Sequence, residues 1–424
     1  MLEATASRDP NGAPLLALPM EVLEHILLFC HPRDVARFSQ TCRFSTDLVY
    51  RSADQYFWRH LFLSLFDDPR HSIGPLRGVD PSSYDWKAQL KGRIEAERDA
   101  SFKTDDPELE SAALETLVSV SAEALPLPSP PDKPVLSRNV EWLKNIVGKT
   151  DIVQPLSLPN QWRDRLKSCL AIHFEDNPQA LRTQSRCFVY DVRNYNSANL
   201  WGPYLRNGDV NWSHLYLIIN VVAFNIRELP LDNMIRPPTG SEATRAHSAP
   251  GDFTGQDWAG VEGTWLRYVS FMDYRDLFGF NFSGSEDGAR EPSFFDDEGF
   301  REATRLIELN LHIISKEKMR VKFPHDDPPS RVHPSYEVLY FAGTSRGAST
   351  GQETTVQGFV HMGLDHIPRW RLTSIHDGQT QWSTEGVQIG NVGSAIGVAG
   401  TWSAFEHGDG DPVGPTWFWK VESD

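Results

Sequence analysis

The sequence predicts an α+β chain of several domains: a short N-terminal three-helix segment, a mostly helical middle region and a C-terminal antiparallel β-barrel of about eight strands. Three observations lead to this prediction. Apolar residues recur at helical spacing near the N-terminus, short runs with alternating apolar residues crowd the C-terminal part, and polar or proline-rich stretches separate these regions. A chain of 424 residues is long enough for more than one hydrophobic core.

The N-terminal helical segment spans residues 15–62. Pro19 suits the first turn of a helix, and Pro32 ends that helix because the residue before a proline leaves the α region. Between them, apolar residues recur at the spacing of an amphipathic helix: Val22, Leu23, Ile26, Leu27 and Cys30. Two more short helices follow, the last running from Leu48 toward Phe62. Three helices this short cannot bury all their apolar surface among themselves, so part of it must contact something else.

The same segment resembles an F-box. The resemblance is carried by the opening Leu18-Pro19-Met20-Glu21-Val22-Leu23, the Pro32-Arg33-Asp34 connection, the pair Cys42-Arg43 and the closing Phe57-Trp58. It implies binding to a Skp-type adaptor and, through it, to the cullin of an SCF ubiquitin ligase. By the same resemblance, the adaptor contacts would be Leu18, Pro19, Val22, Ile26, Phe29, Pro32 and Val35. The alternative is an ordinary helical subdomain whose apolar face packs on residues 140–235.

The middle region, residues 63–235, is predicted to be mostly helical and to contain a proline-rich loop at 126–134. Its strongest helix lies within Val210–Leu229, where apolar residues line one stripe. Cys187–Val192 is predicted to form a short strand. Residues 236–256 are small, polar and without periodicity, and are predicted to be a linker.

Residues 257–424 are predicted to form the barrel. Arg305–Ser315 alternates strictly between apolar and polar residues, as a half-buried strand does. Seven similar runs share the domain, separated by Gly, Pro, Asp and Ser, which favours antiparallel hairpins. The tripeptide Gly-Thr-Trp occurs at Gly263–Trp265 and at Gly400–Trp402, which favours a closed barrel over a sandwich, because glycine permits the bends of barrel strands.

The barrel segment is similar at its two ends, residues 261–271 and 386–420, to the substrate-receiving barrel of F-box receptors of the cyclin-D-targeting type and their plant and fungal relatives. This resemblance implies a non-catalytic substrate receptor, with a protein substrate held by the barrel. Aromatic residues dominate peptide contacts. The candidate substrate-binding residues are Trp265, Arg267, Trp382, Gln388, Trp402 and Trp419. Two alternatives stay open: a lipocalin-like barrel for a small ligand or peptide, and an F-box used outside ubiquitin ligation.

Composition narrows the classes of function. A formal net charge of −16 and a pI near 5.3 argue against a nucleic-acid-binding protein, which would carry a basic face. The four cysteines show no C-x-x-C spacing and favour a reducing compartment. The N-terminus lacks the apolar segment of a signal peptide, and the apolar runs are too short to span a bilayer. We therefore expect a cytosolic or nuclear protein without membrane contact.

No motif in the sequence indicates catalysis, a metal or a cofactor. Gly390–Gly397 lacks the Gly-Lys-Ser/Thr ending of a phosphate-binding loop, and strand packing explains its glycines. His361, His366 and His376 do not have the spacing of a metal site, and Asp296–Glu298 lacks the spacing of a calcium loop. A catalytic site assembled from distant residues remains as a further alternative, although no nucleophile has a motif context.

Overall fold

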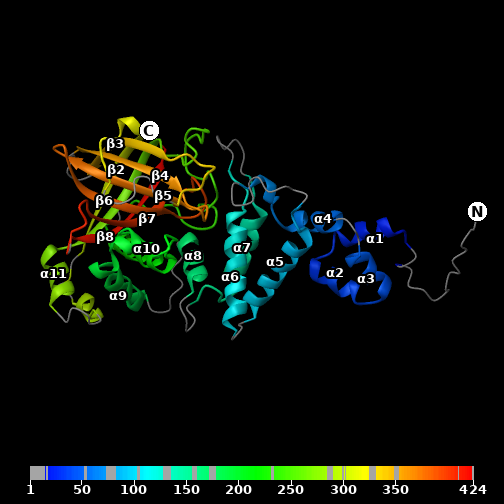
Figure 1. Ribbon diagram of the computed structural model, residues 1–424. Helices are drawn as coiled ribbons and strands as arrows, with labels where there is room; N and C mark the ends of the chain where they lie inside the picture. Colours follow the sequence, from blue (N-terminus) through cyan, green and yellow to red (C-terminus); the bar gives the residue numbers. More distant parts are fainter. Residues whose placement is uncertain are drawn as a thin grey trace, which may run out of the picture.

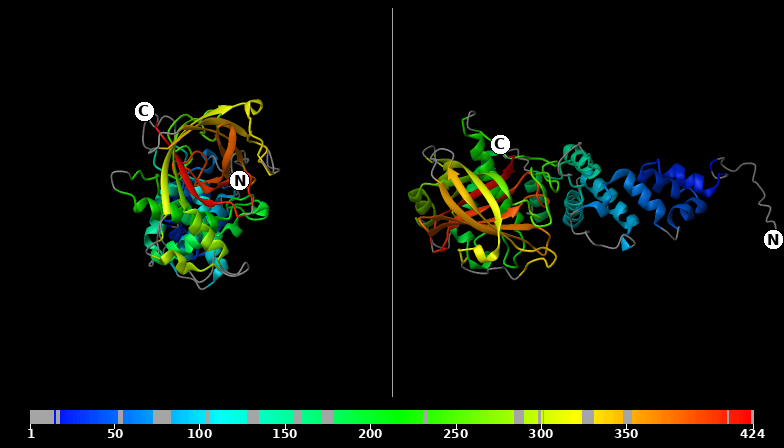
Figure 2. Two further views of the ribbon diagram at one scale, coloured as in Figure 1. Left: turned by 90° about the vertical axis from the view of Figure 1, so that its left-hand side faces the viewer. Right: turned by 90° about the horizontal axis from the view of Figure 1, so that it is seen from above.

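The computed structural model places the N-terminal helices at one end of an elongated molecule and the β-barrel at the other, with a helical region between them (Figure 1). The same order is seen from above (Figure 2). The structure describes the residues 15, 18–51, 55–72, 83–102, 106–127, 135–154, 160–170, 178–230, 234–283, 290–297, 300, 302–323, 331–347, 353–408 and 410–422. Most of the predicted proline-rich loop lies outside them.

The N-terminal segment forms four helices around a small core. They are α1 (Met20–Leu27), α2 (Pro32–Ser39), α3 (Arg43–Tyr50) and α4 (Tyr56–Leu65). Leu23, Val35 and Leu61 are buried among the residues of this core, and Pro32 opens α2 at its first position. The predicted third helix is wrong in one respect: α3 ends at Tyr50, and Phe57 and Phe62 belong to a separate helix.

The middle region is helical. Its helices are α5 (Trp86–Ser101), α6 (Pro107–Ala122), α7 (Arg138–Lys149), α8 (Gln161–Leu170), α9 (Pro178–Val189) and α10 (Trp212–Arg227). Side chains of Asp85, Asp106, Ser137 and Asn211 accept hydrogen bonds from the backbone at the first turns of α5, α6, α7 and α10. The strand predicted at Cys187–Val192 is wrong, because Cys187 lies in the last turn of α9 and Val192 begins a 3₁₀ turn.

The C-terminal part is a closed antiparallel barrel, as predicted. Its strands are β1 (Gly263–Met272), β2 (Glu302–Ile314), β3 (Leu339–Gly347), β4 (Glu353–Met362), β5 (Pro368–His376), β6 (Gln379–Gln388), β7 (Val398–Ala404) and β8 (Val413–Val421). Each strand pairs with the next along the chain, and β8 pairs back to β1, so the barrel has no free edge. Helix α11 (Tyr274–Phe282) lies in the β1–β2 connection.

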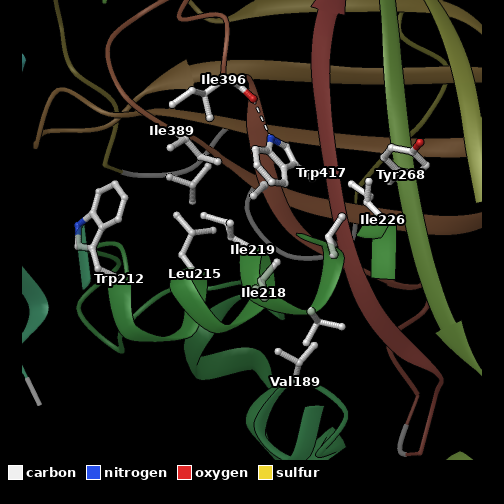
Figure 3. Packing of buried hydrophobic residues seen from close by; sticks show 14 of the residues in the cluster. Val189, Trp212, Leu215, Ile218, Ile219, Ile226, Tyr268, Ile389, Ile396 and Trp417 are labelled. Carbon is white, nitrogen blue, oxygen red and sulfur yellow. Dashed lines mark hydrogen bonds between the residues drawn. The ribbon is translucent and has the colours of Figure 1, made fainter. Parts of the chain in front are cut away.

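Helix α10 covers part of the outer barrel wall. Leu215, Ile218 and Ile219 on α10 belong to one buried cluster with Trp417 of β8, shown in Figure 3. The indole N–H of Trp417 donates to the carbonyl of Ile396 over 2.7 Å, which satisfies its polar group inside the cluster. The barrel therefore shares one hydrophobic core with α9 and α10.

A buried ion pair adds a polar link between the helices and the barrel. The Arg186 guanidinium on α9 lies 2.8 Å from the Glu302 carboxylate on β2, and both side chains are almost fully buried. Arg186 also donates to Asn225, and Asn225 donates to Ser270 on β1. The Tyr190 hydroxyl hydrogen-bonds to the second Glu302 oxygen. Burial nevertheless raises the pKa of Glu302, because the charged form loses its water, although Arg186 opposes that shift.

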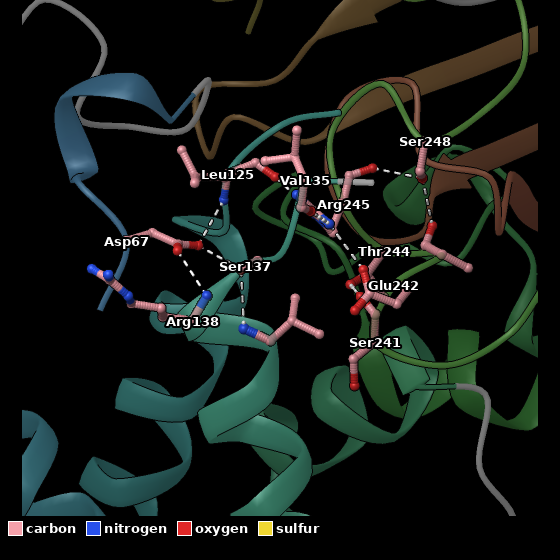
Figure 4. Close-up of polar contacts among 12 residues, drawn as sticks. Asp67, Leu125, Val135, Ser137, Arg138, Ser241, Glu242, Thr244, Arg245 and Ser248 are labelled. Carbon is pink, nitrogen blue, oxygen red and sulfur yellow. Dashed lines mark hydrogen bonds and ion pairs between the residues drawn. The ribbon is translucent and has the colours of Figure 1, made fainter. Parts of the chain in front are cut away.

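A second polar network joins the N-terminal helices to the barrel side, as Figure 4 shows. The Asp67 carboxylate, just after α4, accepts from the backbone N–H groups of Leu125 at 3.0 Å and Arg138 at 2.8 Å, and from the Ser137 hydroxyl. Arg245 donates to the carbonyls of Leu125 and Val135 from the opposite side. Buried hydrogen bonds of this kind fix the relative position of the elements that they join.

Arg245 belongs to the segment 236–256, which was predicted to be a linker. In the structure it is a strap packed on the barrel: Thr244 and Ala246 are buried, and the Asn391 N–H donates to the Thr244 carbonyl at 2.9 Å. Gly390, in the β6–β7 connection, allows this close approach, since a Cβ there would lie only 2.8 Å from that carbonyl oxygen.

Candidate functional site

Helix α1 has two apolar faces. One face is buried, with Leu23 and Leu27 in the core of the N-terminal helices. The other is open to solvent and carries Val22 and Ile26, with Leu18 just before the helix and Phe29 just after it; we call these four exposed residues the α1 stripe. Val22 is 43% exposed, Ile26 40% and Phe29 81%. A row of large apolar side chains left in water on one helix face is typical of a protein contact surface.

The other predicted adaptor contacts divide between surface and core. Pro19 is exposed beside the stripe. Pro32 is buried, and Val35 is only 1% exposed in the core of the N-terminal helices, so neither presents a surface here, and we correct both to structural residues. The F-box resemblance implied both as contacts, but both side chains are buried on the inward face of α2. Met20, which the sequence reasoning missed, is exposed next to the stripe.

A comparison with family models bears on this segment. The model described as F-box-like matches residues 15–64. These residues form an F-box-like domain. No match to the chain was found among curated proteins or among solved structures. None of the helices in the described residues is long and apolar enough to cross a membrane.

The F-box-like domain thus provides one candidate site, and the barrel interior provides another. Side chains facing into the barrel are packed at one end. Trp265, Trp370 and Phe418 meet there edge to face, with ring centroids 5.0–5.8 Å apart. The indole N–H of Trp265 donates to the Val261 carbonyl at 2.9 Å. All belong to one buried cluster, so this end of the barrel is a filled core that forms a floor.

Arg267 lies on the same inward face of β1, two residues beyond Trp265. Its Nε donates to the Thr416 hydroxyl at 2.9 Å, and its Nη2 donates to the Thr384 hydroxyl at 2.6 Å. The Thr416 hydroxyl in turn donates to the Tyr268 carbonyl, which leaves its oxygen lone pairs for the guanidinium. Burial lowers the pKa of Arg267 to about 10.

Beyond Arg267, the inward-facing side chains become open to solvent. Trp382 on β6 is 42% exposed and meets Trp402 on β7 edge to face at 5.3 Å. Phe271 on β1 lies 6.5 Å from Trp402, and the Arg305 guanidinium lies 4.8 Å above the Phe271 ring. We call this group the cup: Arg267 at its base, with Phe271, Arg305, Trp382 and Trp402 around it.

Three of the predicted substrate-binding residues therefore lie in the cup, namely Arg267, Trp382 and Trp402. The other three do not. Trp265 is part of the floor. The Gln388 amide donates to Ser394 and to the Gly397 carbonyl, where it holds the β6–β7 turn. Trp419 faces outward and packs in the cluster under α10. We correct these three to core residues, because none faces the open part of the barrel.

Two other buried arginines of the barrel, Arg369 and Arg371, are already paired with carboxylates. A cavity of about 360 Å³ on the outer wall is lined by Arg369, Arg371 and Glu385. Arg369 lies 2.7 Å from Asp365, and Arg371 lies 2.6 Å from Glu385. Burial raises the pKa of Glu385 to about 7 in spite of Arg371. Arg371–Glu385 joins β5 to β6, and Arg369–Asp365 joins β5 to the β4–β5 connection, so this cavity offers no uncompensated charge from these groups.

Proposed function

We propose that the chain is a substrate-recognition subunit of an SCF-type E3 ubiquitin ligase. The observation that carries the proposal is the α1 stripe on the F-box-like domain: Leu18, Val22, Ile26 and Phe29 remain in water, although Leu23 and Leu27 of the same helix are buried in the core of that domain. Laying this stripe into an apolar groove of a Skp-type adaptor is a helix-in-groove contact. Through the adaptor the chain would reach the cullin.

The middle region supports this proposal as a rigid spacer. Asp67 accepts hydrogen bonds from Leu125 and Arg138, and Arg245 donates to the carbonyls of Leu125 and Val135. These hydrogen bonds link the helices after α4 to the strap at 236–256. The Arg186–Glu302 pair and the α10 cluster fix the barrel on the helices. A rigid link matters because a slack one lowers the effective concentration of a bound substrate at the ligase.

The barrel would receive the protein substrate. Its open end is the end that carries the β1–β2 connection with α11, and α11 lies at the far end of the molecule from α1 (Figure 1). The receptor role needs no catalytic residue in this chain. Its contribution to the rate is proximity, since the acceptor lysine is held where the ubiquitin thioester arrives. The four free cysteines are consistent with the cytosol or nucleus as the place of action.

Co-purification tests this function. The full chain is expressed with a Skp-type adaptor and the matching cullin, and the complex is isolated by size exclusion. We expect one stable assembly containing all three proteins. Capture of the adaptor without the cullin would favour an F-box used outside ubiquitin ligation, and failure to capture the adaptor would contradict the proposal.

A further inference from the structure

Helix α11 carries a second row of exposed apolar side chains. Tyr274, Phe278 and Phe282 are four residues apart in turn, so they lie on one face of the helix. Their exposed fractions are 63%, 54% and 47%, and the rings of Phe278 and Phe282 lie 4.9 Å apart. Among the described residues, α1 and α11 are the two helices that leave three large apolar side chains in water. We call the three aromatic residues of α11 the α11 stripe.

The α11 stripe is not needed to hold its helix in place. On the opposite face, Leu277 and Phe280 are buried in the cluster that joins the barrel to α9 and α10. The Phe280 ring lies 4.8 Å from the ring of Phe295 in the 3₁₀ turn Pro292–Asp296. Single exposed apolar residues are ordinary, but a contiguous row of them is typical of a contact surface. Packing within the chain therefore explains one face of α11 and leaves the other to a partner.

The chain around the α11 stripe is strongly acidic. Residues 273–300 contain eight aspartate or glutamate residues and only two arginines. One of these, Arg290, is withdrawn from the surface: its side chain is 6% exposed and lies 3.7 Å from Asp191. The acidic residues that are exposed in the described part of this segment are Asp273, Glu291, Asp296 and Asp297.

The β7–β8 connection extends this acidic surface. It passes beside the α11 stripe, because a Cβ at Gly410 would lie 3.4 Å from the Phe282 ring. Residues 405–412 contain three acidic residues and no lysine or arginine, and Glu406 among them is exposed. The aromatic row thus lies within a surface of negative charge, contributed by two connections of the barrel.

This charge decides among the possible occupants. A second copy of the chain, packed stripe against stripe, would bring acidic residues against acidic residues. A membrane-binding helix has lysine and arginine beside its apolar face, whereas Arg275 is the one cation of α11. A basic protein segment is favoured on both counts: its apolar side chains cover the aromatic rings, and its cations meet carboxylates or ring faces.

We propose that the α11 stripe binds a basic amphipathic segment of another protein, with lysine or arginine residues beside a row of apolar residues. The contact lies outside the barrel, on the helix that is far from the α1 stripe (Figure 1), so one chain can hold this segment and an adaptor together. The inference rests on the proposed function only in taking the bound protein to be the ligase substrate.

Three peptides test the proposal on the full chain by titration calorimetry. The basic amphipathic peptide is acetyl-Lys-Leu-Lys-Lys-Leu-Leu-Lys-Lys-Leu-amide. One counterpart has glutamate in place of every lysine, and the other has serine in place of every leucine. We expect the basic amphipathic peptide to bind about tenfold or more tightly than either counterpart, because it alone matches both the charge and the apolar row. A counterpart that binds equally well would overturn the proposal.

The variant Tyr274→Ser, Phe278→Ser should weaken binding of the basic amphipathic peptide about tenfold or more, at an unchanged melting temperature, because both side chains are exposed. The matched control is Phe102→Ser, Leu136→Ser, whose parent side chains are 71% and 84% exposed. It should bind the peptide as the wild type does. Undiminished binding by the stripe variant would contradict the proposal.

Further measurements separate the other occupants and the other site. The variant Leu18→Asp, Ile26→Asp should keep the peptide binding, and adaptor binding measured on the same samples reports a failure of the F-box function separately. Sedimentation of the concentrated chain tests for a dimer, and flotation with phosphatidylcholine–phosphatidylserine vesicles tests for membrane binding. We expect neither to depend on the α11 stripe. A dimer or a vesicle complex that is lost in Tyr274→Ser, Phe278→Ser would overturn the proposal in favour of that occupant.

Discussion

Replacing Leu18 and Ile26 together by aspartate is expected to abolish adaptor binding. Both side chains are exposed on the α1 stripe, so the free chain does not need them for its own core. In a complex, each introduced aspartate would have to bury a charge in the adaptor's apolar groove. The apolar contacts of the Leu18 and Ile26 side chains would be lost as well. We expect a loss of about 4 kcal/mol or more, roughly a thousandfold in Kd, measured by titration calorimetry with purified adaptor.

The matched control is the pair Leu109→Asp and Leu364→Asp. These leucines are as exposed as the stripe residues but lie on α6 and in the β4–β5 connection. The control should bind the adaptor with wild-type affinity, and both double variants should melt at the wild-type temperature. Equal binding by the stripe variant and the wild type would show that the stripe is not the contact.

The second large effect is expected from Arg186→Met, which leaves the Glu302 carboxylate buried without its cation. Breaking a buried pair on one side typically costs about 3–5 kcal/mol. Urea unfolding at pH 7 should show this loss of unfolding free energy. The double variant Arg186→Met, Glu302→Gln should lose less than the single variant, because it removes the uncompensated charge.

The loss should also depend on pH. In Arg186→Met, burial holds the pKa of Glu302 above its value in the unfolded chain, and the opposing effect of Arg186 is gone. The Glu302 carboxylate then binds a proton more tightly in the folded state than in the unfolded state. The free energy of unfolding therefore falls as pH rises through the pKa of Glu302 in the folded chain. It recovers as pH falls toward the pKa of Glu302 in the unfolded chain. A smaller defect at pH 5 than at pH 7 is expected, and a defect independent of pH would contradict this cause.

Periodicity predicted the regular elements well. The apolar stripe within Val210–Leu229 became α10 (Trp212–Arg227), and the alternation in Arg305–Ser315 became β2 (Glu302–Ile314). Both patterns are set by local geometry, which the sequence displays directly. The split between α3 and α4 was missed, because no proline or glycine marks the break between Tyr50 and Tyr56.

The candidate sites were predicted only in part, for a different reason. The sequence indicates that Trp382, Trp402 and Trp419 bury large side chains, but their direction depends on the strand register of the closed barrel. In the closed barrel, the Trp402 side chain faces the cup. The Trp419 side chain faces outward and packs under α10. Phe271 and Arg305 were missed because they come together only through the pairing of β1 with β2.

Hydrogen–deuterium exchange of the full chain, alone and with the adaptor, shows whether the α1 stripe is the adaptor contact. We expect binding to protect the backbone amides of residues 18–29, around the α1 stripe, and to leave exchange in the β-barrel unchanged. Unchanged exchange at 18–29 in a chain saturated with adaptor, or protection confined to the barrel, would contradict it.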